Sequence, residues 1–325
     1  MTPASRSAGR RSIKLLALLE QGTISGEALS RKLGVSRQAM HKRVESLRGR
    51  GYGIEGRPRA GYRLVSRPEG WVREDILRGL RTKVLGRNPI CFESVESTQE
   101  EAKALAAGGA PEGTLVLGEV QTRGRGRHGR SWVSPRGGIW ASLILRPPVG
   151  PQDAPLIGQI ACLGLAEAAE AVAGVRSLVK WPNDVLARNG RKLAGVLAEM
   201  SSESERIHWL VLGLGVNANN PLPAGLARTA ASLKSVSGKP VPRTEFLQRF
   251  LSNFEKAYFS FLAGERNGFH ASYRRRSHLR PGDRVTIRDG DAGTKGRFVR
   301  FDRDGALVQR TDDGRLIRHL AGDVA

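Results

Sequence analysis

The sequence is poor in cysteine, and its histidines are scattered. Cys91 and Cys162 are far apart and stand in apolar contexts, which fits reduced thiols and argues against a disulfide framework. The six histidines show no metal-ligand spacing with one another or with cysteine, so the pattern does not predict a zinc site. We therefore expect a fold held by side-chain packing in a cytoplasmic protein.

Long apolar runs are also missing. None approaches the roughly 18 to 20 residues of a membrane span, and the longest candidates, Leu15–Leu19 and Ile139–Leu145, fit a helix and a strand. The start, Met1–Arg11, is rich in arginine and serine but has no apolar core of a signal peptide. A transit peptide is the alternative for this stretch, although a helical pattern begins almost at once, at Ile13.

Acidic residues are outnumbered. The 325 residues carry 53 Lys and Arg against 31 Asp and Glu, a formal net charge of +22, and this length favours two or three domains. Residues 1–67 hold 15 Lys and Arg and four acids, so 15 minus 4 places +11 in about a fifth of the chain. A solvated basic face is the alternative, but such concentration favours a polyanionic partner.

The first 50 residues predict three short helices. Ile13–Leu19 fits a buried helix, and Ser25 can cap a second helix that ends at Gly34. Ser36 can cap a third helix that runs through Arg50, with a basic outer face. This order is typical of a helix-turn-helix.

Two short strands around Ile54 and Leu64 then enclose a basic hairpin tip, or wing. A helical-hairpin interaction module is the alternative, but the turn, the basic third helix and the basic wing together favour DNA binding. The side chains expected to reach DNA are Arg37, Gln38, Lys42, Arg43, Arg57 and Arg59.

From Ile76 to about Tyr273, strand-like runs alternate with helical patterns, which indicates an α+β sheet domain. The helix expected at Pro155–Val172 is apolar on nearly every face, and that at Thr244–Leu262 has an aromatic stripe. The strand-like runs are 90–92, 115–120, 139–145, 177–181, 193–199 and 208–216. After residue 280, short strands separated by Asp-Gly turns at 289–290, 304–305 and 313–314 predict a small barrel.

Glycine and arginine alternate in the loop Gly124–Arg130. Its glycines let the backbone fold around a ligand, while Arg125, Arg127 and Arg130 seek oxygen anions. A basic disordered linker of the RNA-binding kind is the alternative, but the apolar flanks are those of a packed domain. We interpret the stretch as a mobile anion-binding loop.

Three further motifs carry a similar chemistry. Lys180-Trp181-Pro182-Asn183-Asp184 leaves a lysine at a strand end that should meet carboxylate or phosphate, unless it pairs with its neighbour Asp184. Gly195 in the run Lys192–Glu199 has low β-propensity, which indicates either access for a ligand or close packing at this point of the strand. Gly213-Leu214-Gly215-Val216-Asn217 ends in an amide suited to ribose or phosphate oxygens.

Ser97 and Thr98 precede Glu100 and Glu101 at capping-box spacing, for a helix that runs to Gly108. The two hydroxyls are therefore either helix caps or ligand-binding groups. In this order, the Ser-Thr pair, the Gly/Arg loop and the three motifs resemble those of biotin protein ligases. With the N-terminal segment, the chain resembles the bifunctional biotin operon repressor type.

The resemblance implies an α+β protein in four parts: a winged helix-turn-helix at 1–66, a linker at 67–75, a mixed-sheet ligase domain at 76–276 and an SH3-like β-barrel at 277–325. It also implies two reactions. Biotin carboxylate attacks the α-phosphate of ATP to give biotinyl-5'-AMP, which then acylates a lysine of a biotin carboxyl carrier protein. Mg²⁺ is expected with ATP, with Asp184 only a guess as ligand, and the adenylate-bound form is expected to dimerise and repress biotin genes.

The roles that the resemblance implies fall on four groups of residues. Lys180 and Arg127 are expected to be catalytic. Biotin is expected to contact Ser97, Thr98, Gln99, Gln121, Arg125, Gly126, Arg127, Lys180 and Gly195. The nucleotide is expected to contact Arg127, Arg130, Trp132 and Asn217.

Two positions depart from the family pattern. His128 stands where another arginine is common, which lowers the loop charge and predicts pH-sensitive retention of the adenylate. Gln99 follows Ser-Thr where asparagine is usual, so a contact on the ureido side of biotin is in question. A ligand-responsive regulator without ligase turnover and a lipoate-type ligase are the alternative functions.

Changing Arg37, Lys42 and Arg43 together to alanine should strongly weaken DNA binding, because the third helix would lose its cations. Fluorescence anisotropy with DNA from upstream of biotin genes measures this. Wild-type affinity should fall steeply with salt. Unaltered binding by the triple variant would show that the recognition helix is wrongly assigned.

Overall fold

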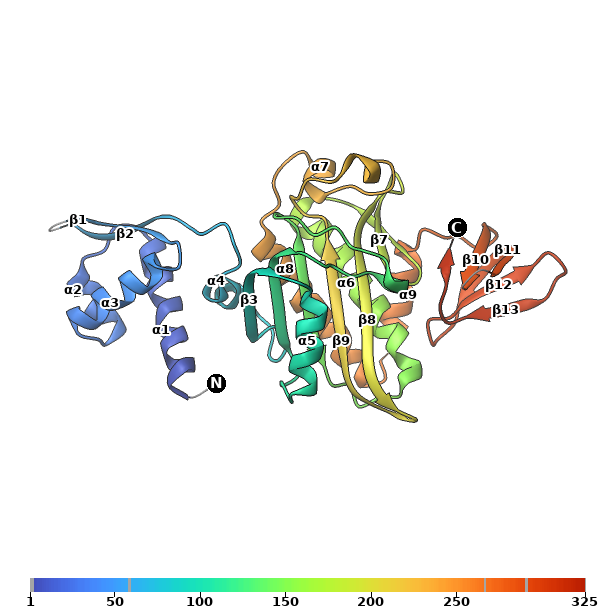
Figure 1. The fold of residues 1–325 in the computed structure, drawn as a ribbon, viewed down its shortest axis with the longest axis horizontal. Helices are drawn as coiled ribbons and strands as arrows, with labels where there is room; N and C mark the ends of the chain where they lie inside the picture. Colours follow the sequence, from blue (N-terminus) through green and yellow to red (C-terminus); the bar gives the residue numbers. More distant parts are fainter. Residues whose placement is uncertain (1–2, 58–59, 266, 290–291, 325) are drawn as a thin grey trace. The chain divides into compact units, whose positions relative to one another are not determined.

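The computed structural model describes residues 3–57, 60–265, 267–289 and 292–324. The chain divides into two compact units, Met1–Gly79 and Leu80–Ala325 (Figure 1). The first unit contains α1 (Pro3–Glu20), α2 (Gly26–Leu33), α3 (Arg37–Arg48), β1 (Gly53–Arg57), β2 (Gly61–Ser66) and α4 (Arg73–Gly79). Strands β1 and β2 pair antiparallel as the predicted wing.

The predicted caps form in the first unit. The Ser25 hydroxyl accepts a hydrogen bond from the Ala28 amide at 3.1 Å, and the Ser36 hydroxyl accepts one from Ala39 at 3.2 Å. Gly34 ends α2 in the left-handed conformation, with φ +61°. The first helix is longer than expected and begins at Pro3 rather than near Ile13.

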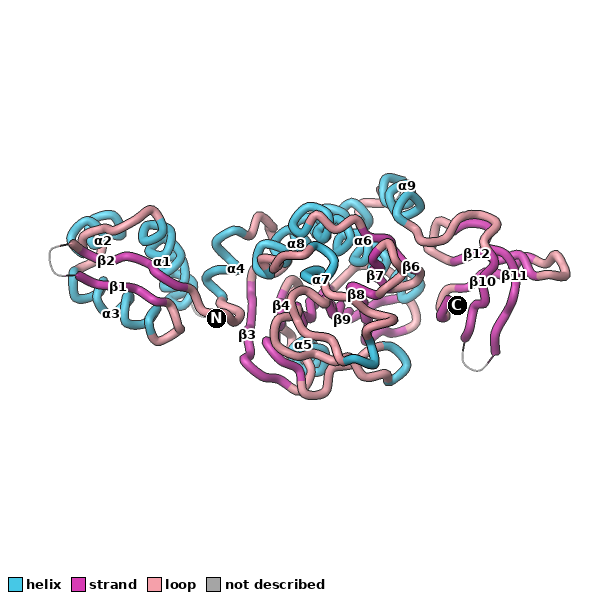
Figure 2. The backbone as a smooth tube through the Cα atoms, turned by 90° about the horizontal axis from the view of Figure 1, so that it is seen from above, coloured by secondary structure: helices cyan, strands magenta, loops and turns pink. Residues whose placement is uncertain are grey.

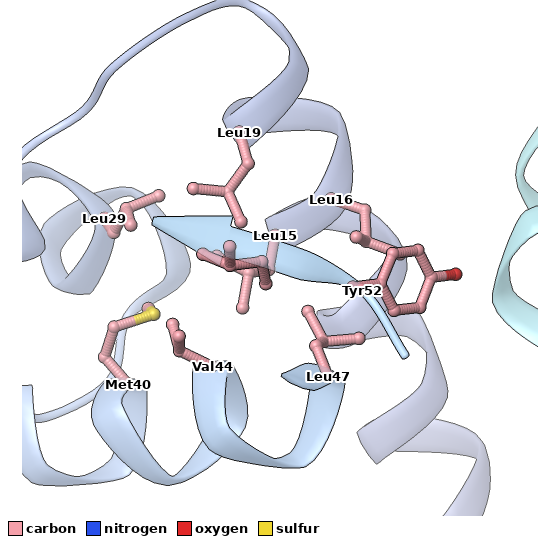
Figure 3. Close-up of a cluster of buried hydrophobic side chains, with 9 residues drawn as sticks. Leu15, Leu16, Leu19, Leu29, Met40, Val44, Leu47 and Tyr52 are labelled. Atoms are coloured by element: carbon pink, nitrogen blue, oxygen red, sulfur yellow. The ribbon is translucent and has the colours of Figure 1, made fainter. Parts of the chain in front are cut away.

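A compact apolar core holds the three helices and the wing together. Figure 3 shows leucines of α1 meeting α2, α3 and the residue before β1. The labelled side chains are Leu15, Leu16, Leu19, Leu29, Met40, Val44, Leu47 and Tyr52, all at most 2% exposed. Burial of this helical stripe is what positions the basic outer face of α3.

Helix α4 belongs to the first unit. The Glu74 carboxylate, with 7% of its side chain exposed, is ion-paired with Arg50, and Asp75 is ion-paired with Arg67. Residues 67–75, expected from sequence to be a linker, therefore include the start of a helix that is tied to the helix-turn-helix.

The second unit is built on a seven-stranded sheet in the order β3-β4-β5-β9-β8-β7-β6. Only β3 and β4 pair in parallel; the other neighbours are antiparallel. The strands are β3 (Asn88–Val95), β4 (Thr114–Gln121), β5 (Ile139–Leu145), β6 (Ser177–Lys180), β7 (Asp184–Ala187), β8 (Lys192–Glu203) and β9 (Arg206–Val216). Each strand-like run predicted in this region overlaps one of them, and β7 was not predicted.

Helices cover both faces of this sheet. Figures 1 and 2 show α5 (Thr98–Ala107) on one face and α6 (Ala154–Ala173) with α8 (Arg243–Leu262) on the other. The aromatic stripe of α8 is buried, and Phe250, Phe254 and Tyr258 stack along it with ring centroids 5.5 and 5.7 Å apart. The shorter helices are α7 (Leu233–Ser237) and α9 (Asn267–Arg276).

One stretch among the described residues, Pro151–Ala173, is long and apolar enough to cross a membrane. The expectation that no apolar run approaches that length is therefore wrong. Within the fold, 78% of its most apolar window is buried, because α6 packs between the sheet and α8. The helix serves as the core of the second unit, as its all-round apolar pattern predicted.

The C-terminal strands form a separate antiparallel sheet in the order β13-β12-β11-β10-β14, consistent with an SH3-like barrel. They are β10 (Arg284–Asp289), β11 (Ala292–Phe301), β12 (Leu307–Thr311), β13 (Leu316–His319) and β14 (Asp323–Val324). Turns at Gly305 and Gly314 connect strands as predicted, whereas the turn at 289–290 extends outside the described residues.

The turn at Gly305 fixes the barrel to the domain built on the seven-stranded sheet. Its carbonyl accepts hydrogen bonds from Gln159 Nε2 of α6 at 2.8 Å and from Trp181 Nε1 at 3.0 Å. The Trp181 indole, 1% exposed, thus reaches the barrel rather than a ligand. The Lys180–Asp184 motif therefore has a structural half and, from Asn183 onward, a half that faces a cavity.

Gly305→Ala and Gly314→Ala form a matched pair, because both glycines have φ above +80°. A Cβ at Gly305 would lie 2.8 Å from Gln159 Nε2, whereas a Cβ at Gly314 would meet nothing within 4 Å. We expect Gly314→Ala to lower the free energy of unfolding by about 1–2 kcal/mol and Gly305→Ala by more, since α6 must shift. Thermal unfolding of the full chain measures this; equal losses would contradict the docking contact.

Candidate functional site

A cavity of about 450 Å³ opens beside the start of α5, the end of β4 and strands β8 and β9. Loops 125–133 and 222–230 and the C-terminal strand β14 complete its wall. The sequence-predicted residues in the lining are Ser97, Thr98, Gln99, Gln121, Arg125, Gly126, Arg127, Arg130, Trp132, Gly195 and Asn217. Lining residues that were not predicted include Ser142, Asn183, Lys192, Leu222, Leu226 and Asp323, while Asp184, earlier only a guessed metal ligand, also lines it.

One end of the cavity is a network of neutral polar groups. Gln121 Oε1 accepts hydrogen bonds from the Thr98 amide at 2.8 Å and the Thr98 hydroxyl at 3.0 Å. Ser142 Oγ lies 3.0 Å from Thr98 Oγ1 and donates to Gln99 Oε1 at 3.0 Å. Such a fixed set of donors and acceptors suits a small uncharged polar ring with N–H and C=O groups.

The Ser97 side chain does not act as the helix cap that its position in the sequence offers. It occupies the N-cap of α5, yet its side chain makes no capping hydrogen bond, so the predicted capping box does not form. The hydroxyl oxygen is buried and has no hydrogen-bond partner among the described residues. Because a buried polar group without a partner is costly, this hydroxyl is suited to a ligand.

Gln99 fills space that a glycine leaves open. A Cβ at Gly213 would lie 2.5 Å from Gln99 Oε1. The amide is largely committed within the protein, since Nε2 also donates to the Val211 carbonyl at 3.2 Å. Gln99 therefore shapes the polar end of the cavity, whether or not it contacts a ligand directly.

The floor of the cavity is formed by glycines of β8 and β9, which have no side chains, and the Trp132 indole covers it. Gly195 and Gly215 are register partners on β8 and β9, and a Cβ on either would come within 3.0 Å of the Trp132 ring. Gly195 was expected to contact a ligand; here the indole lies over it. Trp132 Nε1 is buried without a hydrogen-bond partner among the residues described.

The lysine in the cavity is Lys192. Its ammonium lies 2.7 Å from Asp184 Oδ1 and 4.9 Å from the centroid of the Trp132 ring. Lys180, expected to be catalytic, is not among the described lining residues. Lys180 ends β6, two strands from β8 in the sheet order, whereas β8 runs along the cavity, so the structure brings Lys192 to the cavity in place of Lys180.

The Gly/Arg loop brings three arginines to the other end. Arg125 pairs with Glu100 of α5 at 3.0 Å, and Arg130 pairs with Asp323 of β14 at 2.6 Å. Arg127 donates to Asn183 Oδ1 at 3.0 Å and lies 3.4 Å from Asp323 Oδ1. Cations therefore converge here, each with an acceptor from a different element of the fold.

Asp323 is held in its charged form. Burial raises the pKa of this carboxyl, but the hydrogen bond from Arg130 and the charges of Arg130 and Arg127 more than offset that effect, so its pKa is lowered. An ionised carboxylate therefore sits where an anionic ligand would meet the loop arginines. No sequence signal pointed to it, because it lies near the end of a different domain.

His128 shapes the loop through its backbone. With φ 55° and ψ 35°, it is the non-glycine residue that adopts the left-handed region within the described ranges. Histidine tolerates this region better than most residues do. The loop then closes through the Gly126 amide, which donates to the Arg130 carbonyl at 2.7 Å.

Loop 222–230 holds the lysine strand in place. The Lys192 amide donates to the Thr229 carbonyl at 2.8 Å, and the Ala231 amide donates to the Lys192 carbonyl at 3.0 Å. Asn217, predicted on the nucleotide side, is 4% exposed and accepts from Asn220 Nδ2 at 3.2 Å. Leu222 and Leu226 make this side of the cavity partly apolar, which suits a flat heterocycle.

The predicted DNA-binding residues lie on the first unit. Arg37, Gln38 and Lys42 are exposed on α3, and Arg37 pairs with Glu27 at 3.0 Å. Arg43 is half-buried and donates to the Ala39 carbonyl at 3.4 Å. Arg57 is exposed on the wing, and Arg59 lies outside the described residues.

Both units match known families. Residues 91–217 match the Biotin/lipoate A/B protein ligase family, and residues 11–63 match an HTH domain. The bifunctional ligase/repressor BirA of Bacillus spizizenii is 37% identical over 312 residues, 93% of this chain and 94% of that protein. A biotin--[acetyl-CoA-carboxylase] ligase of Paracoccus denitrificans is 34% identical over 68% of this chain and 94% of its own length.

Solved structures agree with the sequence relatives. The biotin protein ligase from Aquifex aeolicus, in complex with biotin and ATP, is similar with a TM-score of 0.64 and 28% identity. The match covers 74% of this chain and 98% of that chain, so the Aquifex protein corresponds to about three quarters of this one. The match with the HTH domain accounts for the N-terminal residues.

Proposed function

The chain belongs to the biotin protein ligases of the bifunctional ligase/repressor type, and on that premise we propose that its cavity joins biotin to ATP and passes the biotinyl group to a carrier protein. The observation that carries the proposal is the division of the cavity into a neutral polar end and a cationic end. A ligand with a ureido ring at one end and a carboxylate at the other matches this division. The relatives named as biotin ligases support the same conclusion.

The neutral end suits the ureido ring of biotin. The ring has two N–H donors and one carbonyl acceptor, and Ser97, Thr98 and Gln121 present hydroxyl and amide groups around one space. The unpartnered Ser97 hydroxyl gains a partner when the ring binds. We place the aliphatic chain of biotin along the Gly195–Gly215 floor, so the Trp132 indole must move aside or cover the chain.

The cationic end addresses the electrostatic problem of the first step. The carboxylate oxygen of biotin attacks the α-phosphorus of ATP, the bond to the bridging oxygen breaks, and pyrophosphate leaves. Two anions must approach each other, so cations that touch both lower the barrier. We assign Lys192 to the carboxylate and α-phosphate, Arg127 to phosphate, and Arg130 to the nucleotide side.

The second step acylates a carrier lysine. The amine nitrogen attacks the acyl carbon of biotinyl-AMP, the bond to phosphate oxygen breaks, AMP leaves, and the amine proton is lost to solvent or to AMP. No covalent bond to the enzyme is required. Loop closure by Arg125, Arg127 and Arg130 would protect the mixed anhydride from water until the carrier arrives.

Mg²⁺ fits this site through the nucleotide. Mg²⁺ is commonly bound by one or two carboxylates together with substrate phosphates, and the cavity wall offers Asp184 and Asp323. No group of three or more His, Cys, Asp or Glu able to hold a metal occurs in the described part of the chain. We propose that the ion arrives with ATP and neutralises phosphate charge.

We propose that the first unit binds operator DNA when the second holds biotinyl-AMP. Its net positive charge and the exposed side chains of α3 support DNA binding. In this account, adenylate orders the cavity loops and favours a homodimer, which couples biotin supply to repression. Because both DNA and ATP are cytoplasmic, we place the protein in the cytoplasm.

Incubation with ATP, Mg²⁺ and a carrier domain tests the substrate. Biotin should be transferred to the carrier and lipoate should not, as read by mass spectrometry of the carrier. Transfer of lipoate alone would favour the lipoate-type alternative. Tight binding of biotin with no transfer would favour a regulator without ligase turnover.

The variants Lys192→Gln and Lys180→Gln test which of the two lysines is catalytic. Loss of the charged contacts of Lys192 should slow biotin-dependent pyrophosphate release by about tenfold to a hundredfold, the range expected for a hydrogen bond to a charged group. Lys180→Gln should retain most of the activity, since Lys180 lies outside the described cavity lining. The reverse order of effects would restore Lys180 as the catalytic lysine.

Arg127→Ala should release biotinyl-AMP before the carrier binds it, because Arg127 is only 20% exposed, lines the cavity and is the cation assigned to phosphate. Escaped adenylate labels lysines of bystander proteins, which mass spectrometry detects. Arg123→Ala is the matched control: Arg123 is 76% exposed, pairs with Glu96, and is outside the lining. Equal labelling by both variants would contradict a retaining role of Arg127.

A further inference from the structure

Asn183 lies in the turn between β6 and β7 and lines the cavity. The residue is fixed to β8 by one side-chain and one main-chain hydrogen bond: Asn183 Nδ2 donates to the Val196 carbonyl at 2.8 Å, and the Val196 amide donates to the Asn183 main-chain carbonyl at 2.9 Å. Because Nδ2 must face a carbonyl, Oδ1 must face the opposite way. It accepts from Arg127 Nη1 at 3.0 Å.

The loop arginines differ in how they are held. Arg125 and Arg130 are 57% and 68% exposed, and each meets a carboxylate at the protein surface. Exposed pairs of this kind are weak and are screened by salt. Arg127 is 20% exposed, and its shortest contact is the one to Asn183.

The other acceptors of Arg127 are longer or are themselves charged. The Gly322 carbonyl and Asp323 Oδ1 both lie 3.4 Å from Arg127 Nη1. A phosphate that enters the cavity competes with the Asp323 carboxylate for the same cations. The Asn183 amide is neutral, so it can hold the guanidinium without consuming the charge that attracts phosphate.

We propose that Asn183 is a positioning residue that orients Arg127 toward the phosphate of ATP and biotinyl-AMP before either is present. This inference rests on the proposed function and extends it to a residue that acts through Arg127. Pre-orientation removes part of the entropy cost of ordering a long side chain on binding. Asn183 therefore contributes to nucleotide affinity and adenylate retention, and it contributes little to biotin affinity.

The test is a double-mutant cycle on the full chain. Asn183→Ala should raise the KM for ATP about tenfold and speed the loss of biotinyl-AMP by a similar factor, while the KM for biotin changes less than twofold. In an Arg127→Ala background, the same substitution should change these values less than twofold, because its target is gone. A general structural defect would move the KM for both substrates and would add to Arg127→Ala.

Two further variants keep the result interpretable. Asn183→Asp keeps an oxygen beside Arg127, but its carboxylate competes with phosphate for the guanidinium and cannot donate to the Val196 carbonyl, so it should lose adenylate at least as fast as Asn183→Ala does. Asn189→Ala is the control for amide loss: Asn189 is exposed, accepts from the Arg191 amide at 3.3 Å, and does not line the cavity in the described structure. It should behave as wild type.

The outcomes separate this inference from the proposed function. Additive effects in the cycle, or adenylate retention by Asn183→Asp equal to that of wild type, would overturn the positioning role while leaving the ligase assignment intact. Wild-type protein that makes no biotinyl-AMP would refute the proposed function. In that case, ATP titration calorimetry still decides the inference: unchanged ATP affinity in Asn183→Ala would overturn it.

Discussion

Four cations lie at one end of the cavity, and the structure depends on the anion or dipole that each of them contacts. Arg125 meets Glu100 of α5, and Lys192 meets Asp184 of β7. Arg127 and Arg130 meet Asp323 of β14. These carboxylates come from elements far apart in sequence. The sheet, helix α5 and the barrel must therefore all be in place before the four cations can lie together without repelling one another.

This constraint explains the position of the C-terminal barrel. Its Gly305 turn docks on α6 and Trp181, and its last strand carries Asp323 to the Gly/Arg loop. The barrel therefore supplies part of the cavity wall as well as its own core. In the proposed reaction, phosphates replace the carboxylate of Asp323, so the ligand-free and ligand-bound cavities differ in which anion neutralises the arginines.

Local patterns in the sequence predicted much of the fold, and long-range geometry decided the rest. Ser25, Ser36 and Gly34 act as caps within a few residues of themselves, so the helix-turn-helix could be predicted from spacing. The choice between Lys180 and Lys192 could not be predicted, because it depends on which strand of the sheet runs along the cavity. Asp323 and Asn183 were missed for the same reason. Spacing alone left Ser97 either a helix cap or a ligand-binding group, because it does not report where a hydroxyl points.

The most direct measurement is a crystal structure of the chain grown with biotin, ATP and Mg²⁺. The account predicts density for biotinyl-AMP in the cavity, with the ureido ring at Ser97 and Thr98 and the phosphate within hydrogen-bond distance of Lys192 and Arg127. Asp323 should no longer be the main partner of the loop arginines. Density for the adenylate elsewhere, or phosphate bound to Lys180 with Lys192 still paired to Asp184, would contradict it.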